Sequence, residues 1–111
     1  MFNKNQYKKH AQKELKLVIH KLRAGYKPDK IILFGSMAKG NIKASSDIDL
    51  MIVKKTQKNP WARLKEADKY FDHNFPIDFL IYTPSEIEER LKINDPFVSN
   101  IFKNGKVLYE K

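Results

Sequence analysis

The spacing of apolar residues along the chain predicts helices that alternate with short strands. In residues 4–24 the apolar positions recur every three or four residues, as on one face of an amphipathic helix, and lysines occupy the other faces. Gly25 and Pro28 follow this stripe, and both residue types are common just beyond a helix C-terminus. We therefore expect one long helix that ends near Gly25. Its apolar stripe consists of Tyr7, Ala11, Leu15, Val18 and Leu22.

Three later segments have the composition of strands. Residues 30–36, KIILFGS, form a short β-rich run that stops at a glycine turn. In residues 46–53, SDIDLMIV, successive side chains alternate between two faces, so Asp47 and Asp49 share a face. Residues 76–82, PIDFLIY, place proline only at the first position, where its missing N–H matters least. These runs predict three strands of a small sheet.

Prolines beside capping residues mark the starts of three further helices. A residue that can accept hydrogen bonds from a helix N-terminus stands directly before each proline, and proline itself is favoured in the first helical turn. The middle sequence also has the glutamate of a capping box. The three sequences are NP at 59–60, TPSE at 83–86 and DP at 95–96.

The order of these elements predicts an α+β fold in which helices alternate with the strands of a small sheet. An NG turn at residues 104–105 leads into a last short strand at residues 106–110. No linker, repeat or low-complexity segment divides the chain, so we expect residues 1–111 to form a single domain. Three aromatic residues at core spacing are expected inside it: Trp61, Phe71 and Phe79.

Composition and charge limit the classes of function. Lys and Arg number 22 against 13 Asp and Glu, and the net charge of +9 suits a polyanionic partner, although lysine-rich surfaces are often only solvated. The chain has no cysteine, which excludes disulfides, thiolate metal sites and cysteine nucleophiles. No apolar run reaches the length of a membrane span, and the polar start lacks the apolar core of a signal peptide. We expect a cytoplasmic protein with no membrane partner.

The strand pattern of residues 46–53 places two aspartates inside the expected core, which raises an electrostatic question. Asp47 and Asp49 project from one face, about 7 Å apart at the backbone. Two unpaired carboxylates about 5 Å apart repel by about 3 kcal/mol at an effective dielectric constant of 20. A divalent cation between them turns this repulsion into attraction, and oxygen ligands favour hard ions such as Mg²⁺. Asp78 joins them if its strand lies beside theirs, and it could then accept a proton from an attacking hydroxyl or help to hold a second metal.

A glycine-serine turn upstream offers a place for phosphate. Gly35 and Ser36 follow a predicted strand and precede a predicted short helix, so backbone donors and the Ser36 hydroxyl could contact an anion. Ser36 could also cap that helix. The turn lacks the lysine and Ser/Thr of a P-loop, and the glycine pattern of a dinucleotide site is missing. Ser46 is interpreted as a turn residue and not as a nucleophile, because no histidine stands near it in sequence.

The joint pattern GS-x-A-x-G followed by S-D-I-D-L, within residues 35–50, resembles the signature of the polymerase-β-type nucleotidyltransferase superfamily. The short length resembles the minimal nucleotidyltransferase, or MNT, branch of that superfamily. The resemblance implies a mixed sheet flanked by helices. Lys39 is a departure, since the family commonly has arginine there; the charge is kept but the bidentate guanidinium fork is lost. The resemblance assigns the nucleotide to Gly35, Ser36, Lys39 and Ser46, and the metal and the catalysis to Asp47, Asp49 and Asp78.

This resemblance implies a Mg²⁺-dependent enzyme that holds two ions, with Mn²⁺ as a possible substitute. It would transfer a nucleoside monophosphate from ATP, or another NTP, to a hydroxyl acceptor and release pyrophosphate. The MNT branch is similar to proteins that act with a helical HEPN partner as a toxin–antitoxin pair, in which the MNT protein adenylylates its toxin. A tyrosine of such a partner is therefore an expected acceptor.

A second class of function uses the same basic surface without catalysis. The chain could be an antitoxin-like or RNA-binding module that acts by contact alone. We favour the enzyme over this module and over direct nucleic-acid binding, because a pure binding surface has no need of clustered unpaired carboxylates. Magnesium-dependent ATP binding distinguishes the two classes.

Overall fold

The computed structural model describes residues 3–36, 38 and 47–111 of the chain. Every predicted helix and strand within these residues is present, in the predicted order. The first helix ends in a single π-helical turn, η1, which continues it directly. The elements are α1 (Lys4–Lys21), η1 (Leu22–Tyr26), β1 (Lys30–Phe34), β2 (Ile48–Val53), α2 (Pro60–Asp68), β3 (Ile77–Tyr82), α3 (Pro84–Lys92), α4 (Pro96–Asn104) and β4 (Lys106–Glu110).

The helix starts are fixed by local capping hydrogen bonds. At α2 the side chain of Asn59 accepts from the backbone N–H of Ala62. At α3 Thr83 and Glu86 form the predicted capping box, in which each side chain accepts from the backbone N–H of the other. At α4 Asp95 accepts from two backbone N–H groups of the first turn. The cap signals in the sequence therefore predicted the starts of these helices correctly.

The strands form one mixed sheet in the order β3-β2-β1-β4. β1 pairs antiparallel with both β2 and β4, whereas β2 and β3 run parallel. The crossover from β2 to the parallel β3 is made through α2, as parallel neighbours require a long connection. β3 and β4 are thus the two edge strands, and the predicted mixed sheet flanked by helices is confirmed.

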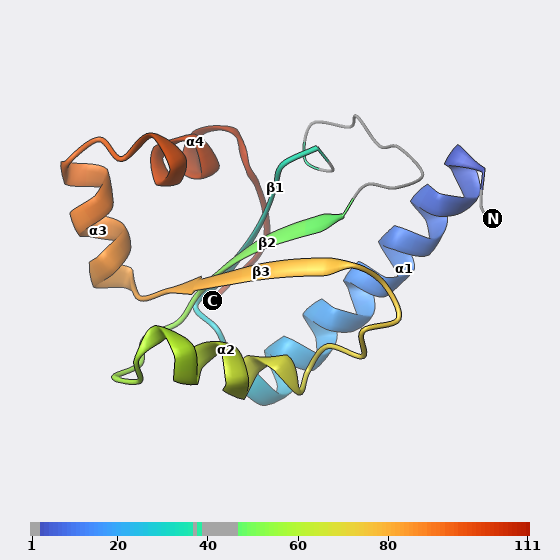
Figure 1. Ribbon diagram of the computed structural model, residues 1–111, viewed down its shortest axis with the longest axis horizontal. Helices are drawn as coiled ribbons and strands as arrows, with labels where there is room; N and C mark the ends of the chain where they lie inside the picture. The colour runs from blue at the N-terminus through green and yellow to red at the C-terminus, as the bar shows by residue number, and fades with distance from the viewer. Residues whose placement is uncertain (1–2, 37, 39–46) are drawn as a thin grey trace.

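Helices cover both faces of the sheet (Figure 1). α1 and α2 lie against one face, and α3 and α4 lie toward the other. β2 shows the alternation that the sequence predicted: Leu50 and Ile52 belong to the core under α1 and α2, whereas Met51 and Val53 pack with residues of α3 and α4. Among the described residues, none of the helices combines the length and the apolar composition that a membrane span requires.

Two local predictions were wrong. Trp61 was expected in the core but is 70% exposed, because the opposite face of α2 carries the buried Ala67 and faces the sheet. Phe71 is buried as expected, whereas Phe79 is only half-buried, although its ring stacks on that of Phe71 with 4.2 Å between the ring centres. Gly25 was expected to end the first helix, but it lies inside η1, and Lys27 adopts the left-handed conformation that ends it. A β-carbon on Gly25 would lie 2.3 Å from Cε1 of Tyr70, so this glycine serves close packing instead.

Candidate active site

The register of the two parallel strands brings the predicted acids together. Asp49 of β2 and Asp78 of β3 are directly paired at their Cα positions. The backbone N–H of Ile48 donates to the carbonyl of Pro76 at 3.0 Å, which extends the same pairing toward Asp47. The condition set by the sequence, that the strand of Asp78 must lie beside the SDIDL strand, is therefore met. All three acids lie at the end of the sheet where β2 and β3 begin.

These acids do not lie in the core, contrary to the expectation from the strand pattern. Asp47 and Asp78 are exposed, and Asp49 is half-buried. The cover on this face is unequal along β2, because residues of α3 and α4 pack with Met51 and Val53, the positions farther from the start of the strand. On this face Met51 and Val53 are buried and Asp49 is only half-buried, whereas on the opposite face of the same strand Ile48 and Leu50 are fully buried. Asp47, Asp49 and Asp78 thus form an open acidic surface at the end of the sheet, called the shelf below.

Like charges face one another across this shelf. Burial, then the charge of Asp78 and then that of Asp47 raise the pKa of Asp49 above its ordinary value of 3.8. Among the ion pairs of the described residues, none joins Asp47, Asp49 or Asp78 to a lysine or arginine. Burial and the charge of Asp47 also raise the pKa of the neighbouring Tyr7 on α1. The described site thus carries negative charge without a neutralising partner.

The glycine-serine turn touches this acidic shelf. Gly35 follows β1 with a φ of +78°, a left-handed backbone conformation that residues other than glycine rarely adopt. A β-carbon on Gly35 would lie 2.5 Å from Oδ2 of Asp49, so the backbone approaches the carboxylate as closely as only glycine allows. Ser36, the next residue, is exposed in the turn. Lys39 and Ser46 lie outside the described residues, so their predicted roles stay predictions.

The donor set of the shelf suits a hard divalent cation in combination with phosphate. In the described part of the chain, no three Asp, Glu, His or Cys side chains lie together closely enough to hold an ion as they stand. Mg²⁺ in phosphoryl-transfer sites is commonly held by one or two carboxylates, while water and substrate phosphates supply its other ligands. The paired carboxylates of Asp49 and Asp78 fit that mode of binding. A complete metal cage made by protein side chains alone is not formed by these residues.

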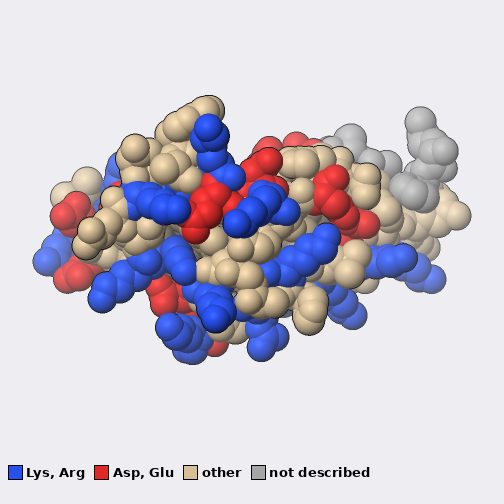
Figure 2. Space-filling model, turned by 90° about the horizontal axis from the view of Figure 1, so that it is seen from below, with Lys and Arg blue, Asp and Glu red and all other residues tan. Residues whose placement is uncertain are grey.

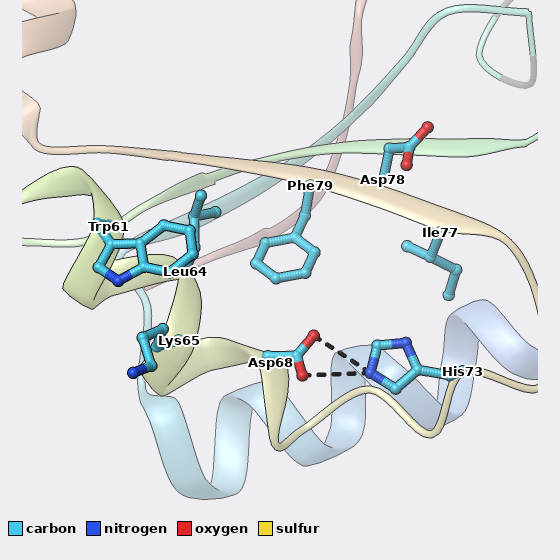
Figure 3. A pocket seen from close by; sticks show the side chains of 8 residues that line it. All are labelled: Trp61, Leu64, Lys65, Asp68, His73, Ile77, Asp78 and Phe79. Atoms are coloured by element: carbon cyan, nitrogen blue, oxygen red, sulfur yellow. Dashed lines mark hydrogen bonds and ion pairs between the residues drawn. The ribbon is translucent and has the colours of Figure 1, made fainter.

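A groove of about 480 Å³ lies between α2 and β3, on the opposite side of β3 from the carboxylate of Asp78. Figure 3 shows Ile77 and Phe79 pointing into it and Asp78 pointing away from it at the rim. Trp61, Leu64 and Lys65 close its other end. The sequence did not predict this groove, because the helical spacing of Trp61 and Leu64 is equally consistent with a buried stripe. The remaining lining residues are Asp68 and His73, whose carboxylate oxygen and Nε2 lie 3.2 Å apart.

Comparison with known families agrees with this geometry. The sequence model of the family described as "Polymerase beta, Nucleotidyltransferase" matches residues 16–111, which include all four strands and the acids at the end of the sheet. The chain belongs to this nucleotidyltransferase family. The match covers most of the chain, so the family assignment made from the short motif within residues 35–50 is confirmed.

Two relatives support the assignment at different levels. A curated protein of Methanocaldococcus jannaschii, named a "putative protein adenylyltransferase", is 32% identical over 110 residues, covering 88% of this chain and 97% of the relative. A crystal structure described as a "putative nucleotidyltransferase" from Sulfolobus solfataricus matches 100% of this chain and 90% of its own, with a TM-score of 0.73 and 17% identity. The first supports membership of the family, and the second shows that the nucleotidyltransferase fold is shared.

Proposed function

We propose that this nucleotidyltransferase transfers AMP from ATP to a hydroxyl group of a protein and releases pyrophosphate. The observation that carries the proposal is the direct pairing of Asp49 with Asp78 beside the close glycine turn at Gly35. A protein acceptor is supported by the name of the Methanocaldococcus relative, a "putative protein adenylyltransferase". The proposal includes ATP as the donor, Mg²⁺ as the cofactor and a protein hydroxyl as the acceptor.

Each residue of the shelf has a role in this reaction. The turn at Gly35 and Ser36 holds the triphosphate through backbone donors and the serine hydroxyl. The acceptor oxygen attacks the α-phosphorus in line with the leaving group. The bond from that phosphorus to the bridging oxygen of the β-phosphate breaks, and pyrophosphate leaves with the bonding electrons. Asp78, exposed at the rim, accepts the proton of the acceptor hydroxyl.

Asp47 and Asp49 are the proposed ligands for Mg²⁺, or Mn²⁺ in its place, with Asp78 as a further ligand when a second ion binds. A bound metal ion would neutralise the negative charge of the carboxylates and of the triphosphate. The chain itself contributes an acidic shelf without described cationic partners and a turn that approaches Asp49 closely. Without the cation, those carboxylates repel the triphosphate. The proposal therefore requires that ATP binding depend on the divalent ion.

We further propose that the acceptor belongs to a separate protein, a HEPN-type helical partner modified on tyrosine. The shelf is open and lies beside the groove lined by Trp61 and Phe79, so a large acceptor can approach Asp78 from outside.

Isotope position tests the reaction type. The protein is incubated with Mg²⁺, a lysate of its host and ATP labelled with ³²P at either the α or the γ position. We expect the labelling that depends on the added protein to come from α-labelled ATP only, to be lost in Asp78→Asn and to be kept in the matched control Asp72→Asn, which changes an exposed aspartate in the loop before β3. Label from the γ position alone would indicate a kinase and reject the proposal, as would equal labelling by Asp78→Asn.

A further inference from the structure

The outer edge of β3 carries backbone groups that the sheet leaves unused. The N–H of Ile48 donates to the carbonyl of Pro76, and the N–H of Lys54 donates to that of Tyr82. In a parallel pair, alternate residues direct their backbone groups to the neighbouring strand, so the even-numbered residues of β3 face β2. The backbone N–H and C=O of Ile77 and Phe79 therefore face outward, on either side of Asp78.

One outward carbonyl is already capped, which confirms this alternation. Arg63 of α2 donates to the carbonyl of Ile81 at 3.4 Å, and its guanidinium is held by Glu86 at 2.7 Å. The cap limits the available edge to the first half of β3, next to the acidic shelf. Proteins usually protect an edge strand with charge, proline or a covering element. Asp78 supplies the only such charge within Ile77–Phe79, and its carboxylate points away from the groove; Ile77 and Phe79 themselves point into the half-apolar groove between α2 and β3 (Figure 3).

We propose that this edge and its groove bind an extended segment of the acceptor protein, which adds to β3 as an antiparallel fifth strand. The proposal rests on the proposed function, because it explains how a hydroxyl reaches Asp78. Antiparallel addition pairs the segment by hydrogen bonds at Ile77 and Phe79 and leaves a non-hydrogen-bonded pair at Asp78. Directly opposed side chains approach most closely at such pairs, with Cα atoms about 4.5 Å apart. A hydroxyl residue at that position lies beside the carboxylate.

The two faces of the sheet then define the sequence of the segment. The residue opposite Asp78 projects to the same face as that carboxylate, whereas its two neighbours project to the other face. That other face is the groove into which Ile77 and Phe79 point (Figure 3). The preferred acceptor is therefore a serine, threonine or tyrosine with an apolar residue on each side.

Charge adds a further preference along the groove. Lys65 lines the end away from Asp78, and its Nζ lies 6.0 Å from the centre of the Trp61 ring. Within the described residues Lys65 forms no ion pair, whereas Lys58 of the preceding loop pairs with Glu66. Figure 2 shows Lys and Arg side chains spread over the face that is seen from below, the side of the sheet on which α1 and α2 lie. Because the segment runs antiparallel to β3, its residues N-terminal to the hydroxyl lie at the end of the groove that holds Lys65. Acidic side chains are therefore favoured at those positions.

Trp61 is the expected anchor of the segment. It is 70% exposed, and tryptophan is one of the residue types enriched among the side chains that dominate the binding energy of protein interfaces. Ile93, in the turn between α3 and α4, is 72% exposed and lies outside the residues that line the groove. It provides a matched control for the loss of an exposed apolar side chain.

A synthetic peptide tests the docking without any nucleotide. The probe is a fluorescein-labelled ten-residue peptide with a central tyrosine between two valines and two glutamates on the N-terminal side. We expect saturable binding by fluorescence anisotropy, weakened about tenfold by Trp61→Ala and several-fold by Lys65→Glu, and changed less than about twofold by Ile93→Ala. In amide hydrogen exchange, we expect the backbone N–H groups of Ile77 and Phe79 to exchange fast in the free protein and more slowly when the peptide is bound.

The hydrogen-bonding requirement separates strand addition from simple apolar contact. A peptide with the same side chains but N-methylated valines cannot donate to the carbonyls of Ile77 and Phe79, and we expect its affinity to fall at least about tenfold. Equal binding of both peptides, absence of binding at millimolar concentration, or protection of β4 in place of β3 would overturn the proposal. Peptide binding without AMP transfer to its tyrosine would reject the proposed function and keep the docking site, so the two failures are distinguishable.

Discussion

Neutralising one acid of the shelf should stabilise the metal-free protein. In Asp49→Asn the side chain keeps its size and loses its charge, so the repulsion from Asp78 and Asp47 disappears. Neighbouring strands lie about 4.8 Å apart, and two charges at about 5 Å repel by about 3 kcal/mol at an effective dielectric constant of 20, or about 1 kcal/mol in bulk water. Asp49 is half-buried and Asp78 is exposed, so solvent screens part of this. We expect a gain of about 1–2 kcal/mol in the free energy of unfolding.

The pH dependence of this gain has a definite sign. The pKa of Asp49 is raised in the fold above 3.8, so the folded state binds more protons than the unfolded state over the range between the two pKa values. The free energy of unfolding contributed by Asp49 therefore falls as pH rises through that range and is lowest at neutral pH. The advantage of Asp49→Asn should accordingly be largest at neutral pH and shrink toward pH 3.

Differential scanning fluorimetry in EDTA measures this effect. A gain of 1–2 kcal/mol corresponds to a rise in Tm of about 3–10 °C for a domain of this size, and 1 M salt should reduce it. The control Asp72→Asn, in an exposed loop, keeps an oxygen that can accept from the backbone N–H of Asn74 and should leave Tm unchanged. Saturating Mg-ATP should raise the Tm of the wild type clearly and that of Asp49→Asn little. A markedly lower Tm for Asp49→Asn in EDTA would show a structural contact and refute the electrostatic reasoning.

Three further predictions concern the turn, an ion pair and the groove. Gly35→Ala should lower the free energy of unfolding by about 1–3 kcal/mol in chemical denaturation, because the φ of Gly35 is +78° and the new methyl group would meet Asp49. The neighbouring Ser36→Ala should lower it by less than about 1 kcal/mol. This second variant should, however, weaken ATP binding measured by calorimetry. Burial acts to raise the pKa of Glu86, but hydrogen bonds from Arg63 and Thr83 hold it below 4.5. Its stabilising contribution is therefore complete above pH 4.5 and lost as pH falls through the folded pKa, and Glu86→Gln should flatten that part of the acid unfolding curve. Trp61→Ala should leave Tm within about 2 °C of the wild type, since the indole is exposed, and a large loss would mean that it belongs to the core.

The sequence predicted those elements whose causes are local. The caps at Asn59, Thr83 and Asp95 lie within a few residues of the backbone groups they satisfy, so their patterns predicted the helix starts. The short glycine-serine and DID motif was specific enough to predict the family before any fold was known. The pairing of Asp78 with Asp49 required one assumption about strand order, which the parallel register of β2 and β3 confirms.

The predictions that failed depended on contacts between distant segments. Helical spacing cannot tell which apolar stripe of α2 meets the sheet, so Trp61 was placed inside although Ala67 occupies the buried face. Gly25 was interpreted as a residue that ends the helix through its backbone freedom. In the structure a side chain at this position would collide with the ring of Tyr70, which lies 45 residues away in the sequence. The acids were placed in the core because a strand pattern does not show where the covering helices end. The groove between α2 and β3 was missed because the helical spacing of Trp61 and Leu64 also fits a buried stripe.

The most direct test of the central claim is the metal dependence of ATP binding. Isothermal titration calorimetry with ATP should detect binding to the wild-type protein in Mg²⁺ and none in EDTA, because the carboxylates of Asp47, Asp49 and Asp78 repel the triphosphate until a cation neutralises them. Asp49→Asn should lose most of the affinity seen in Mg²⁺, while Asp72→Asn should keep it. Equal ATP affinity in Mg²⁺ and in EDTA would contradict the metal-dependent nucleotide site proposed for this end of the sheet.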